Sequence, residues 1–487
     1  MRISSQTLAD QFLASLDKTQ SAISTNEQQI STGQSFQVAG DNPTAATAAV
    51  TLQGSLSQIS AYASNSTTVQ SRLSIQDSAL SSVTAILTNI RTLTVQASNS
   101  TLSNTDRAAL ATNIAQQLQS LTQLANTQDG TGQYLFAGTA TGAPPFVQAA
   151  NGTVSYQGNN GTRQIQIGSG RFVTDTDSGS AVFSNIPNGN GSFAVQPASS
   201  NTGFGVVGTT AVTNSAQYSG HSYKIDFQAP AVVPALGNAG NASLSAPVGA
   251  VAPTPAPGPT TINFLSPTTY TLSFGGTTSA VQTLAANGVI SGNGFSVTLA
   301  GTPAATDSFT VAPGPTYSVT DTTTNTSVVP AGTAYSSGQS ISIPNSGVQL
   351  EISGAPANGD SFAVAPSSNQ SIFATLSNLV SALKTPATTA TQTAALQNAL
   401  NQNLGAIDQA VNNVSDIRTQ VGTRLNAVTA QDTINSNVQL QLQGSLTAAT
   451  STDYAAAITS LSQEQVSLQA AEQSYASLKN LSIFNYL

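Results

Sequence analysis

The fold is decided by the stretch from Leu400 to Val428, LNQNLGAIDQAVNNVSDIRTQVGTRLNAV, in which apolar side chains recur every seventh residue. A repeat of this period keeps one narrow stripe of a helix facing a partner helix, so it predicts coiled-coil packing. Arg418 alone interrupts the alternating spacing of three and four residues along this stripe. The predicted packing positions are Leu400, Ile407, Val414, Val421, Leu425 and Val428.

The same seven-residue repeat occurs near both ends of the chain. One stripe alone would fit packing within a single chain, but its presence at both ends favours helices that pair along their length during assembly. We hypothesise that residues 1–31 and 451–487 are largely disordered in the isolated subunit and fold when neighbours arrive. The positions in these two stripes are Leu16, Ile23 and Ile30, and Tyr454, Leu461, Leu468 and Tyr475.

Helix start signals divide the first part of the chain into three predicted helices. The first covers residues 3–31 and is followed by a turn-rich stretch. The second starts at Asp41-Asn42-Pro43, where a capping side chain precedes proline, and runs to about residue 98. Its middle is weak, because polar side chains such as Asp77 fall on the stripe. Ser103 and Asp106 form a capping-box pattern that predicts the start of the third helix.

The middle of the chain changes to the two-residue period of β-strands. Three segments share the pattern of a strand that ends at proline, and they begin at Gly191, Asp307 and Asp360. We interpret the two aspartates as turn formers.

A second set of alternating segments opens with Tyr223, Tyr270 and Tyr317, which are 47 residues apart, since 270 − 223 and 317 − 270 both give 47. This spacing indicates successive copies of a small β unit. The Ala/Pro/Gly-rich residues 229–260 read as a linker or long loop.

Composition excludes several classes of function. Only 7% of the 487 residues are charged, the net charge is −8, and Lys and Arg together number 12. Nucleic acid and anionic membranes attract clustered positive charge, so neither is an expected partner. No apolar run is long enough for a membrane span, and Asp10 and Asp17 interrupt any secretory signal. The absence of cysteine excludes disulfides and thiol chemistry.

Isolated polar residues give no enzymatic site. The single histidine, His221, has no second histidine or cysteine with which to hold zinc, so we expect no metal, cofactor or catalytic residue. For Arg418, pairing with an acid on another helix is possible, but we expect its long side chain to reach solvent.

Motifs at both ends resemble the flagellin family. The N-terminal resemblance rests on Gln29-Ile-Ser-Thr-Gly33 and on Phe36-Gln-Val-Ala-Gly-Asp-Asn-Pro43. The C-terminal resemblance rests on Val421-Gly-Thr-Arg-Leu-Asn426, Asp453-Tyr454 and the closing Leu481-Ser-Ile-Phe-Asn-Tyr-Leu487. The residues carried over from the family motifs are Gly33, Asp41, Pro43, Gly422, Arg424, Asn426, Asp453 and Phe484.

Two departures set the chain apart from a filament subunit of that family. Gln34-Ser-Phe-Gln-Val38 stands where filament flagellins usually continue with a basic Arg-Ile-Asn-Ser segment, and Phe484-Asn-Tyr-Leu487 replaces their Asn-Val-Leu-rich end. Both favour the hook-associated type that lies at the hook-filament junction. The alternatives are a filament flagellin, or a flagellin-like subunit whose β insertion acts as an adhesin.

The resemblance implies a secreted, extracellular structural protein. Family members pass unfolded through the flagellar type III export apparatus with an export chaperone, self-associate into a ring or tube, and contact an adjacent hook-associated protein and flagellin. We therefore expect an α+β fold with an elongated, coiled-coil-like helical rod formed by both termini. Residues 1–140 and 371–487 would form the two packed flagellin-like helical regions, and residues 141–370 a β-rich insertion of one or two small domains.

Overall fold

The computed structural model describes residues 5–149, 152–229, 231–247, 259–292, 295–312 and 314–480. These residues form two compact units. The terminal unit comprises residues 1–71, 164–174 and 424–487, and the central unit comprises residues 72–163 and 175–423. The expected α+β class, with helical ends and a β-rich middle, is confirmed.

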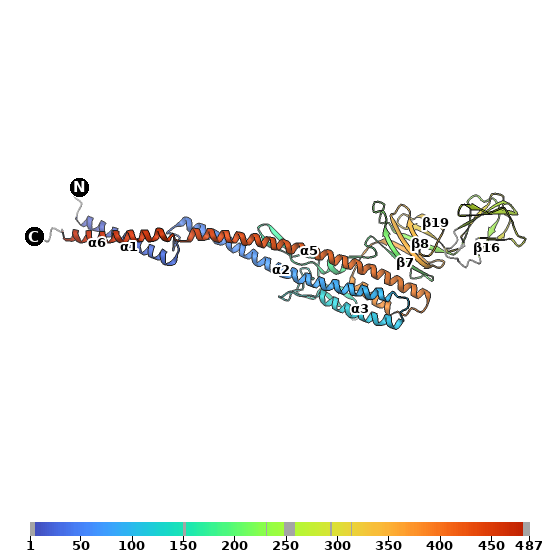
Figure 1. Ribbon diagram of the computed structural model, residues 1–487, viewed down its shortest axis with the longest axis horizontal. Coiled ribbons are helices and arrows are strands. Elements are labelled where there is room, and N and C mark those ends of the chain that lie inside the picture. The colour runs from blue at the N-terminus through green and yellow to red at the C-terminus, as the bar shows by residue number, and fades with distance from the viewer. Residues whose placement is uncertain are drawn as a thin grey trace. The chain divides into compact units, whose positions relative to one another are not determined.

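The described residues form six α-helices (Figure 1). The residues of two of them, α2 and α5, are divided between the two units. α2 and α5 are the long ones, with 55 and 61 residues. The bounds of the six described helices are α1 Ser5–Thr32, α2 Pro43–Ala97, α3 Asn104–Ala125, α4 Ile372–Lys384, α5 Ala390–Thr450 and α6 Tyr454–Asn480.

The predicted helix starts are confirmed by their capping geometry. Asn42 Oδ1 accepts a hydrogen bond from the backbone N–H of Ala45 at 3.1 Å, directly before Pro43 at the first helical position of α2. At α3, the Ser103 hydroxyl accepts from the N–H of Asp106, and the Asp106 carboxylate accepts from the N–H of Ser103. Each cap satisfies backbone donors that have no partner inside the helix.

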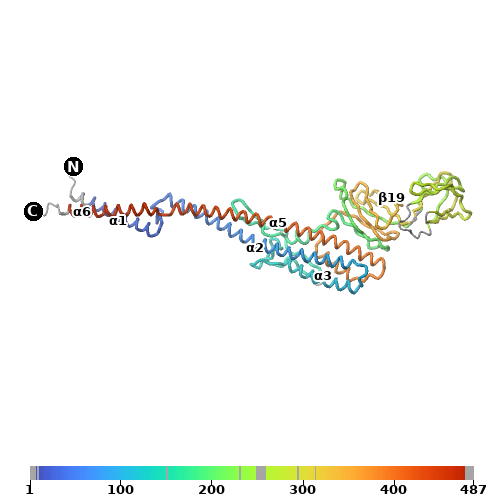
Figure 2. The backbone as a smooth tube through the Cα atoms, viewed as in Figure 1, coloured from blue at the N-terminus to red at the C-terminus, as the bar shows by residue number. Residues whose placement is uncertain are grey.

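In the central unit, α2, α3, α4 and α5 enclose an apolar core. α4 packs against α3, and an Arg91–Asp408 ion pair of 2.6 Å joins α2 to α5, which lie side by side in Figure 2. Phe146, Phe183 and Phe373 pack with ring centroids 4.9–5.7 Å apart at one end of this core. Burying such rings contributes a large share of the apolar stabilisation of a domain.

Three short strand pairs and a π-helix are separate from the two larger β units. β1 (Phe146–Gln148) pairs with β2 (Val154–Tyr156), and β5 (Ile186–Pro187) pairs with β23 (Asn369–Gln370). The π-helix η1 covers Ser180–Ser184. The hairpin of β3 (Gln164–Gly168) and β4 (Arg171–Thr174) belongs to the terminal unit.

The β-rich middle contains a first β unit of eight strands around one core. One sheet has the order β19-β18-β8-β22-β6 and the other the order β20-β21-β7. The strands are β6 Phe193–Pro197, β7 Phe204–Val212, β8 Tyr223–Gln228, β18 Thr316–Asp321, β19 Thr326–Ala334, β20 Ser340–Ile343, β21 Val348–Ala355 and β22 Ser361–Pro366.

A nested β unit is inserted between β8 and β18 of the first. Its sheets have the orders β13-β12-β11-β17-β9, with β14 also paired to β12, and β10-β16-β15, and they enclose a separate core. The strands are β9 Ala231–Pro234, β10 Ser243–Leu244, β11 Thr260–Ser266, β12 Thr269–Phe274, β13 Thr277–Thr278, β14 Gln282–Thr283, β15 Val289–Gly292, β16 Phe295–Ala300 and β17 Ser308–Ala312.

The two β units share one topology and one register. Ile225 of β8 pairs with Phe362 of β22, as Ile262 of β11 pairs with Phe309 of β17. Likewise, Phe362 pairs with Pro197, as Phe309 pairs with Pro234. Equivalent residues therefore differ by 37 before the insertion point, since 262 − 225 = 37, and by 53 near the end, since 362 − 309 = 53.

This register corrects the interpretation of the repeats as successive copies. Tyr317 is equivalent to Tyr270, because they pair with Phe227 and Phe264, respectively. Tyr223, however, is equivalent to Thr260, so its 47-residue distance from Tyr270 does not reflect equivalence. The copies are nested because β8 and β18 are neighbours in one sheet, and residues 231–234 and 243–244 of the expected linker are strands.

Candidate assembly surfaces

The heptad stripe of α5 packs against other parts of the chain. Its side chains at positions 400, 407, 414, 421 and 428 are at most 1% exposed, and Leu425 is half-buried. Such burial accounts for the stripe by packing within each unit. These five positions are therefore core residues of the subunit.

The stripes of α1 and α6 are covered much less. The two helices pack against each other within the terminal unit, where Asn26 Nδ2 donates to Glu464 Oε2 at 2.8 Å and the Phe12 and Tyr475 rings stack at 6.1 Å. Most of the predicted positions are only half-buried, and Tyr454 is exposed. The half-buried ones are Leu16, Ile23, Ile30, Leu461, Leu468 and Tyr475.

In the terminal unit, the break between α1 and α2 lies beside the break between α5 and α6. α1 ends at Gly33, whose φ of 71° suits glycine, and α5 ends just before Ser451. The two breaks are joined by hydrogen bonds from Ser35 N–H to the Thr450 carbonyl at 2.8 Å and from Thr452 N–H to the Gly33 carbonyl at 3.0 Å. A Cβ at Gly33 would lie 2.9 Å from the Tyr454 hydroxyl, so a side chain there would displace that ring.

Two acidic motif residues shape these breaks. Asp453 Oδ1 accepts from the N–H groups of Ala455 and Ala456 and so caps α6. Asp41 Oδ2 accepts from the N–H groups of Gln37 and Val38, and these bonds lower the pKa of Asp41. The remaining motif residues contribute no such cap: Gly422 and Arg424 are half-buried in α5, Asn426 is exposed there, and Phe484 lies outside the described residues.

Large apolar side chains are exposed along the helices and breaks of the terminal unit. Val50 is 75%, Leu440 67% and Val466 66% exposed. On the central-unit helices, Val95 is the only large apolar side chain of the described residues with comparable exposure. Surfaces that expose many such side chains are often covered by partners, and we call this set of side chains the apolar face of the terminal unit. The other side chains that are about half exposed or more are Leu13, Val38, Ile434, Tyr454 and Ile458.

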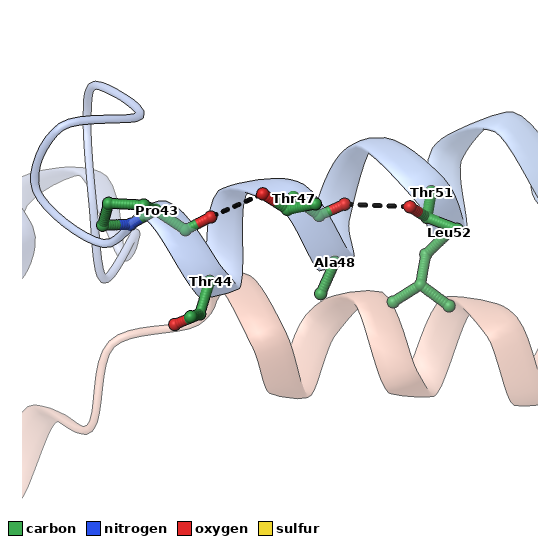
Figure 3. Close-up of a pocket in the computed structure, with 6 residues that line it drawn as sticks. All are labelled: Pro43, Thr44, Thr47, Ala48, Thr51 and Leu52. Atoms are coloured by element: carbon green, nitrogen blue, oxygen red, sulfur yellow. Dashed lines mark hydrogen bonds between the residues drawn. The ribbon is translucent and has the colours of Figure 1, made fainter.

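A hollow of about 660 Å³ opens at the start of α2 (Figure 3). Ala48 and Leu52 form its apolar part and point toward the neighbouring α5 ribbon, while Thr47 and Thr51 donate to the carbonyls of Pro43 and Thr47, respectively. Because these hydroxyls are bonded to their own helix, the hollow offers an apolar contact rather than a polar binding site.

Arg418 corrects one sequence-based expectation. Its Nε donates to Asp77 Oδ1 of α2 at 2.9 Å, so the side chain pairs with an acid on another helix rather than extending into solvent. Asp77 is one of the polar residues that interrupt the stripe of α2. The two polar interruptions therefore pair with each other between α2 and α5 in the central unit.

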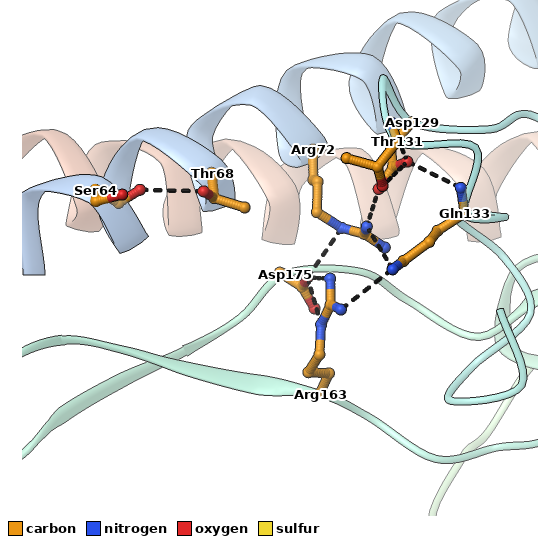
Figure 4. A network of polar contacts seen from close by, with 8 residues as sticks. All are labelled: Ser64, Thr68, Arg72, Asp129, Thr131, Gln133, Arg163 and Asp175. Atoms are coloured by element: carbon orange, nitrogen blue, oxygen red, sulfur yellow. Dashed lines mark hydrogen bonds and ion pairs between the residues drawn. The ribbon is translucent and has the colours of Figure 1, made fainter. Parts of the chain in front are cut away.

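A buried ion network lies beside α2 in the central unit (Figure 4). Arg72 pairs with Asp129 and, through Nε at 2.9 Å, with Asp175, which also accepts from Arg163. Burial lowers the pKa of Arg72, and the nearby Asp175 opposes that change. Burial raises the pKa of Asp129, but hydrogen bonds from Thr131 and Gln133 and the charge of Arg72 outweigh it.

The sequence analysis did not predict this ion network, which has a structural role. Arg72 is 4% exposed and Asp175 is fully buried, so removing either partner would leave an uncompensated buried charge. The network holds α2 to the loop after α3 and to the segments that flank the β3–β4 hairpin. An arginine beside the apolar position Leu73, in a chain with 12 basic residues, was the available signal.

Nothing in the described part of the chain suggests catalysis. His221 Nδ1 lies 2.7 Å from Asp321 Oδ2, which is within hydrogen-bond distance of that carboxylate. No three His, Asp or Glu side chains of the described residues gather in a way that could hold a metal ion. Within those same residues, no helix has the length and apolar content that a bilayer span requires.

Comparison with known proteins agrees with this geometry. The model of the bacterial flagellin N-terminal helical region matches residues 3–141. Flagellar hook-associated protein 3 of Salmonella typhimurium is 36% identical over 186 residues, which cover 38% of this chain and 58% of that protein, and the Escherichia coli protein of the same name is 34% identical over an equal length.

Solved flagellin-like structures extend the similarity over most of the chain. The crystal structure of Xanthomonas campestris FlgL is 27% identical, has a TM-score of 0.57, and is matched over 81% of this chain and 99% of that one. Hook-associated protein 3 of Legionella pneumophila has the same fold, with a TM-score of 0.61 at 24% identity. The predicted resemblance to the flagellin family, and to its hook-associated type, is confirmed. The alignments span 58% of the length of the curated relatives.

Proposed function

We propose that the chain is a structural subunit of the bacterial flagellum at the hook-filament junction, where it joins the hook-side protein to the flagellin filament. The observation that carries this proposal is the exposed apolar face of the terminal unit, which includes Val50, Leu440 and Val466. Similarity to hook-associated protein 3 along 186 residues of this chain supports the junction role rather than that of a filament subunit. The work of such a subunit is packing rather than chemistry.

The apolar face defines the partners. Neighbouring copies would cover it in a ring or tube, and the ends of that assembly would contact an adjacent hook-associated protein and flagellin. Few charges lie on these helices, so the contacts would depend on apolar burial of about 25 cal/mol per Å² rather than on ion pairs. The subunit would be secreted to the extracellular flagellum through the type III export apparatus with an export chaperone.

The division of labour follows the predicted regions. Residues 1–140 and 371–487 would supply the assembly helices, with the predicted stripes and motif residues as packing positions, and residues 141–370 would project the β units. Residues 1–31 and 451–487 would remain largely disordered until neighbours arrive. Amide exchange on the isolated subunit tests the last point, because strong protection at Ile23 and Leu468 would contradict it.

A gene knockout gives the broad test of the junction role. Cells without the protein should build hooks and secrete flagellin but carry no filament, since the adaptor between hook and filament is missing. Deleting residues 451–487 should have the same effect, whereas excising much of residues 141–370 should leave some motility. Full motility after the terminal deletion would refute the proposal.

A pair of substitutions on α6 tests the apolar face itself. Val466→Asp places a carboxylate on a side chain that is 66% exposed, and Gln469→Asp places one on an exposed polar position of the same helix. Val466→Asp should reduce the fraction of hooks that bear filaments, since assembly would bury an unpaired charge. Gln469→Asp should not. Equal filament counts by electron microscopy, with equal flagellin secretion, would show that this face is not an interface.

A further inference from the structure

The nested β unit has an edge that the first β unit uses to bind a helix. In the first unit, side-chain amides of α5 bond the backbone at this edge. Asn398 accepts from the N–H of Val207 at 2.8 Å and donates to the Gly205 carbonyl at 2.9 Å. Asn401 donates to the Val207 carbonyl at 2.8 Å, and Gln402 to the Val195 carbonyl at 3.2 Å.

These amides close one side of the core of the first unit. Val195 and Val207 are only 5% and 6% exposed under α5. An unpaired edge strand presents free N–H and carbonyl groups, and covering it with a polar helix face satisfies them. A neutral amide suits this position, because one Asn side chain can accept from an N–H and donate to a carbonyl at the same time.

In the part of the chain that the structure describes, no helix with such amides covers the equivalent edge of the nested unit. Val207 pairs with Ile352 as Leu244 pairs with Leu299, so Leu244 takes the place of Val207. By the same register, Val232 takes the place of Val195. Ala242 takes the place of Gly205, because it lies two residues before Leu244 as Gly205 lies two residues before Val207. Val232, Ala242 and Leu244 are only partly buried against their core. Among the described residues, no side chain hydrogen-bonds to the backbone of these three positions, which we call the open edge.

We propose that the open edge, Val232, Ala242 and Leu244, docks a helix of a partner protein whose Asn and Gln side chains are spaced like Asn398, Asn401 and Gln402. The occupant follows from the first unit, where the same backbone in the same register binds such a helix. Charge supports an amide partner, because Asp307 is the only charged residue between positions 229 and 315 and its carboxylate is turned to the backbone of Ala239, Gly240 and Ala304.

The test uses the intact chain and a probe whose sequence is known. The probe is a fluorescent peptide of residues 389–412, stapled as a helix on the face opposite Asn398, Asn401 and Gln402. It should bind the full-length protein saturably by fluorescence anisotropy. The covalently attached α5 occupies the edge of the first unit at high effective concentration, so the peptide can reach only the nested unit.

Two matched changes locate the binding. Leu244→Asp should weaken it about tenfold, because docking would bury an unpaired carboxylate. Leu265→Asp is the control, since Leu265 lies in the same unit, is 51% exposed, and is outside the open edge. Alanine at all three amide positions of the peptide should also weaken binding about tenfold, through loss of its hydrogen bonds.

The results separate the proposal from its alternatives. No saturable binding, equal binding of the alanine peptide, or equal loss from Leu265→Asp would overturn it. If circular dichroism shows that Leu244→Asp unfolds the nested unit, the comparison of the original peptide with the alanine-substituted peptide tests the proposal by itself. Sedimentation of the full chain identifies one further outcome: dimerisation that Leu244→Asp abolishes would show that a second copy supplies the helix. The proposal does not depend on the junction role, which concerns the terminal unit.

Discussion

The first and nested β units have the same strand order and the same register, yet they differ in what surrounds them. Each unit fastens its last strand with an aspartate. Asp360 accepts from the N–H groups of Thr202, Gly203 and Ala357, and Asp307 accepts from those of Ala239, Gly240 and Ala304. The first unit is closed by α5, whereas the nested unit keeps an open edge. Register is thus a property of the unit, and edge burial a property of its neighbours.

Replacing the aspartate that precedes the last strand of each β unit should have the largest effect on stability. Asp360→Ala would remove the buried carboxylate that accepts hydrogen bonds from three partly exposed backbone N–H groups, and it should destabilise the first unit by roughly 3 kcal/mol. Asp307→Ala should loosen the nested unit alone. Hydrogen exchange with mass spectrometry resolves β22 from β17, and Asp416→Ala on the exposed face of α5 is the control. Faster exchange in both units from either change would show that they do not fold as separate copies.

Exchanging the residue types at two equivalent positions, a glycine in the first unit and a threonine in the nested unit, should change stability by a smaller amount. Gly359 has a φ of 86°, and Thr306, just before Asp307, has a φ of 81°. A branched side chain is strained there, so Gly359→Thr should destabilise the first unit and Thr306→Gly should stabilise the nested unit, each by about 1 kcal/mol.

Local hydrogen exchange measures both changes. Thr302→Gly is the control, because Thr302 lies in the same loop without a positive φ and its replacement should stabilise nothing. Opposite signs for the two main changes would sharpen the comparison of the units. A loss of stability from Thr306→Gly would break it.

The smallest expected effect is a loss of stability in acid, which should occur in the first unit and not in the nested unit. Burial raises the pKa of Asp321, but hydrogen bonds from His221, Thr324 and Thr323 outweigh it and lower that pKa from 3.8 to about 2. Because the folded value lies below the unfolded one, this stabilisation is present above pH 3.8 and is lost as the pH falls toward about 2. Phe274 occupies the equivalent position of the nested unit and has no such dependence.

Thermal unfolding at pH 6 and pH 3 checks this expectation. Asp321→Asn should lower the melting temperature at pH 6 and narrow the difference between the two pH values. Asp226→Asn, on the neighbouring strand β8, controls for the general effect of removing a carboxylate. An unchanged pH difference in Asp321→Asn would show that the His221–Asp321 pair does not couple folding to pH.

Local signals made much of the helical fold predictable. The seven-residue stripe of α5, the Asn42-Pro43 start of α2 and the Ser103–Asp106 capping box each depend on residues within a few turns of one another. The topology of the β units was not predictable in this way. Equal spacing suggested that Tyr223 and Tyr270 are equivalent, but strand pairing joins residues about 90 positions apart, such as Phe227 and Tyr317, and local spacing contains no record of that choice.

The candidate assembly surfaces were likewise predictable from the sequence only in part. Periodicity identified the stripes of α1, α5 and α6 as packing positions but could not say which are already covered. The packing of the folded chain buries Leu400 and Val421 within the subunit, whereas it leaves Val466 exposed on the terminal unit. It also brought Arg72 to Asp175 and Arg418 to Asp77. The sequence alone determined which segments are amphipathic, because that depends on residue order; which faces remain free depends on all neighbours in space.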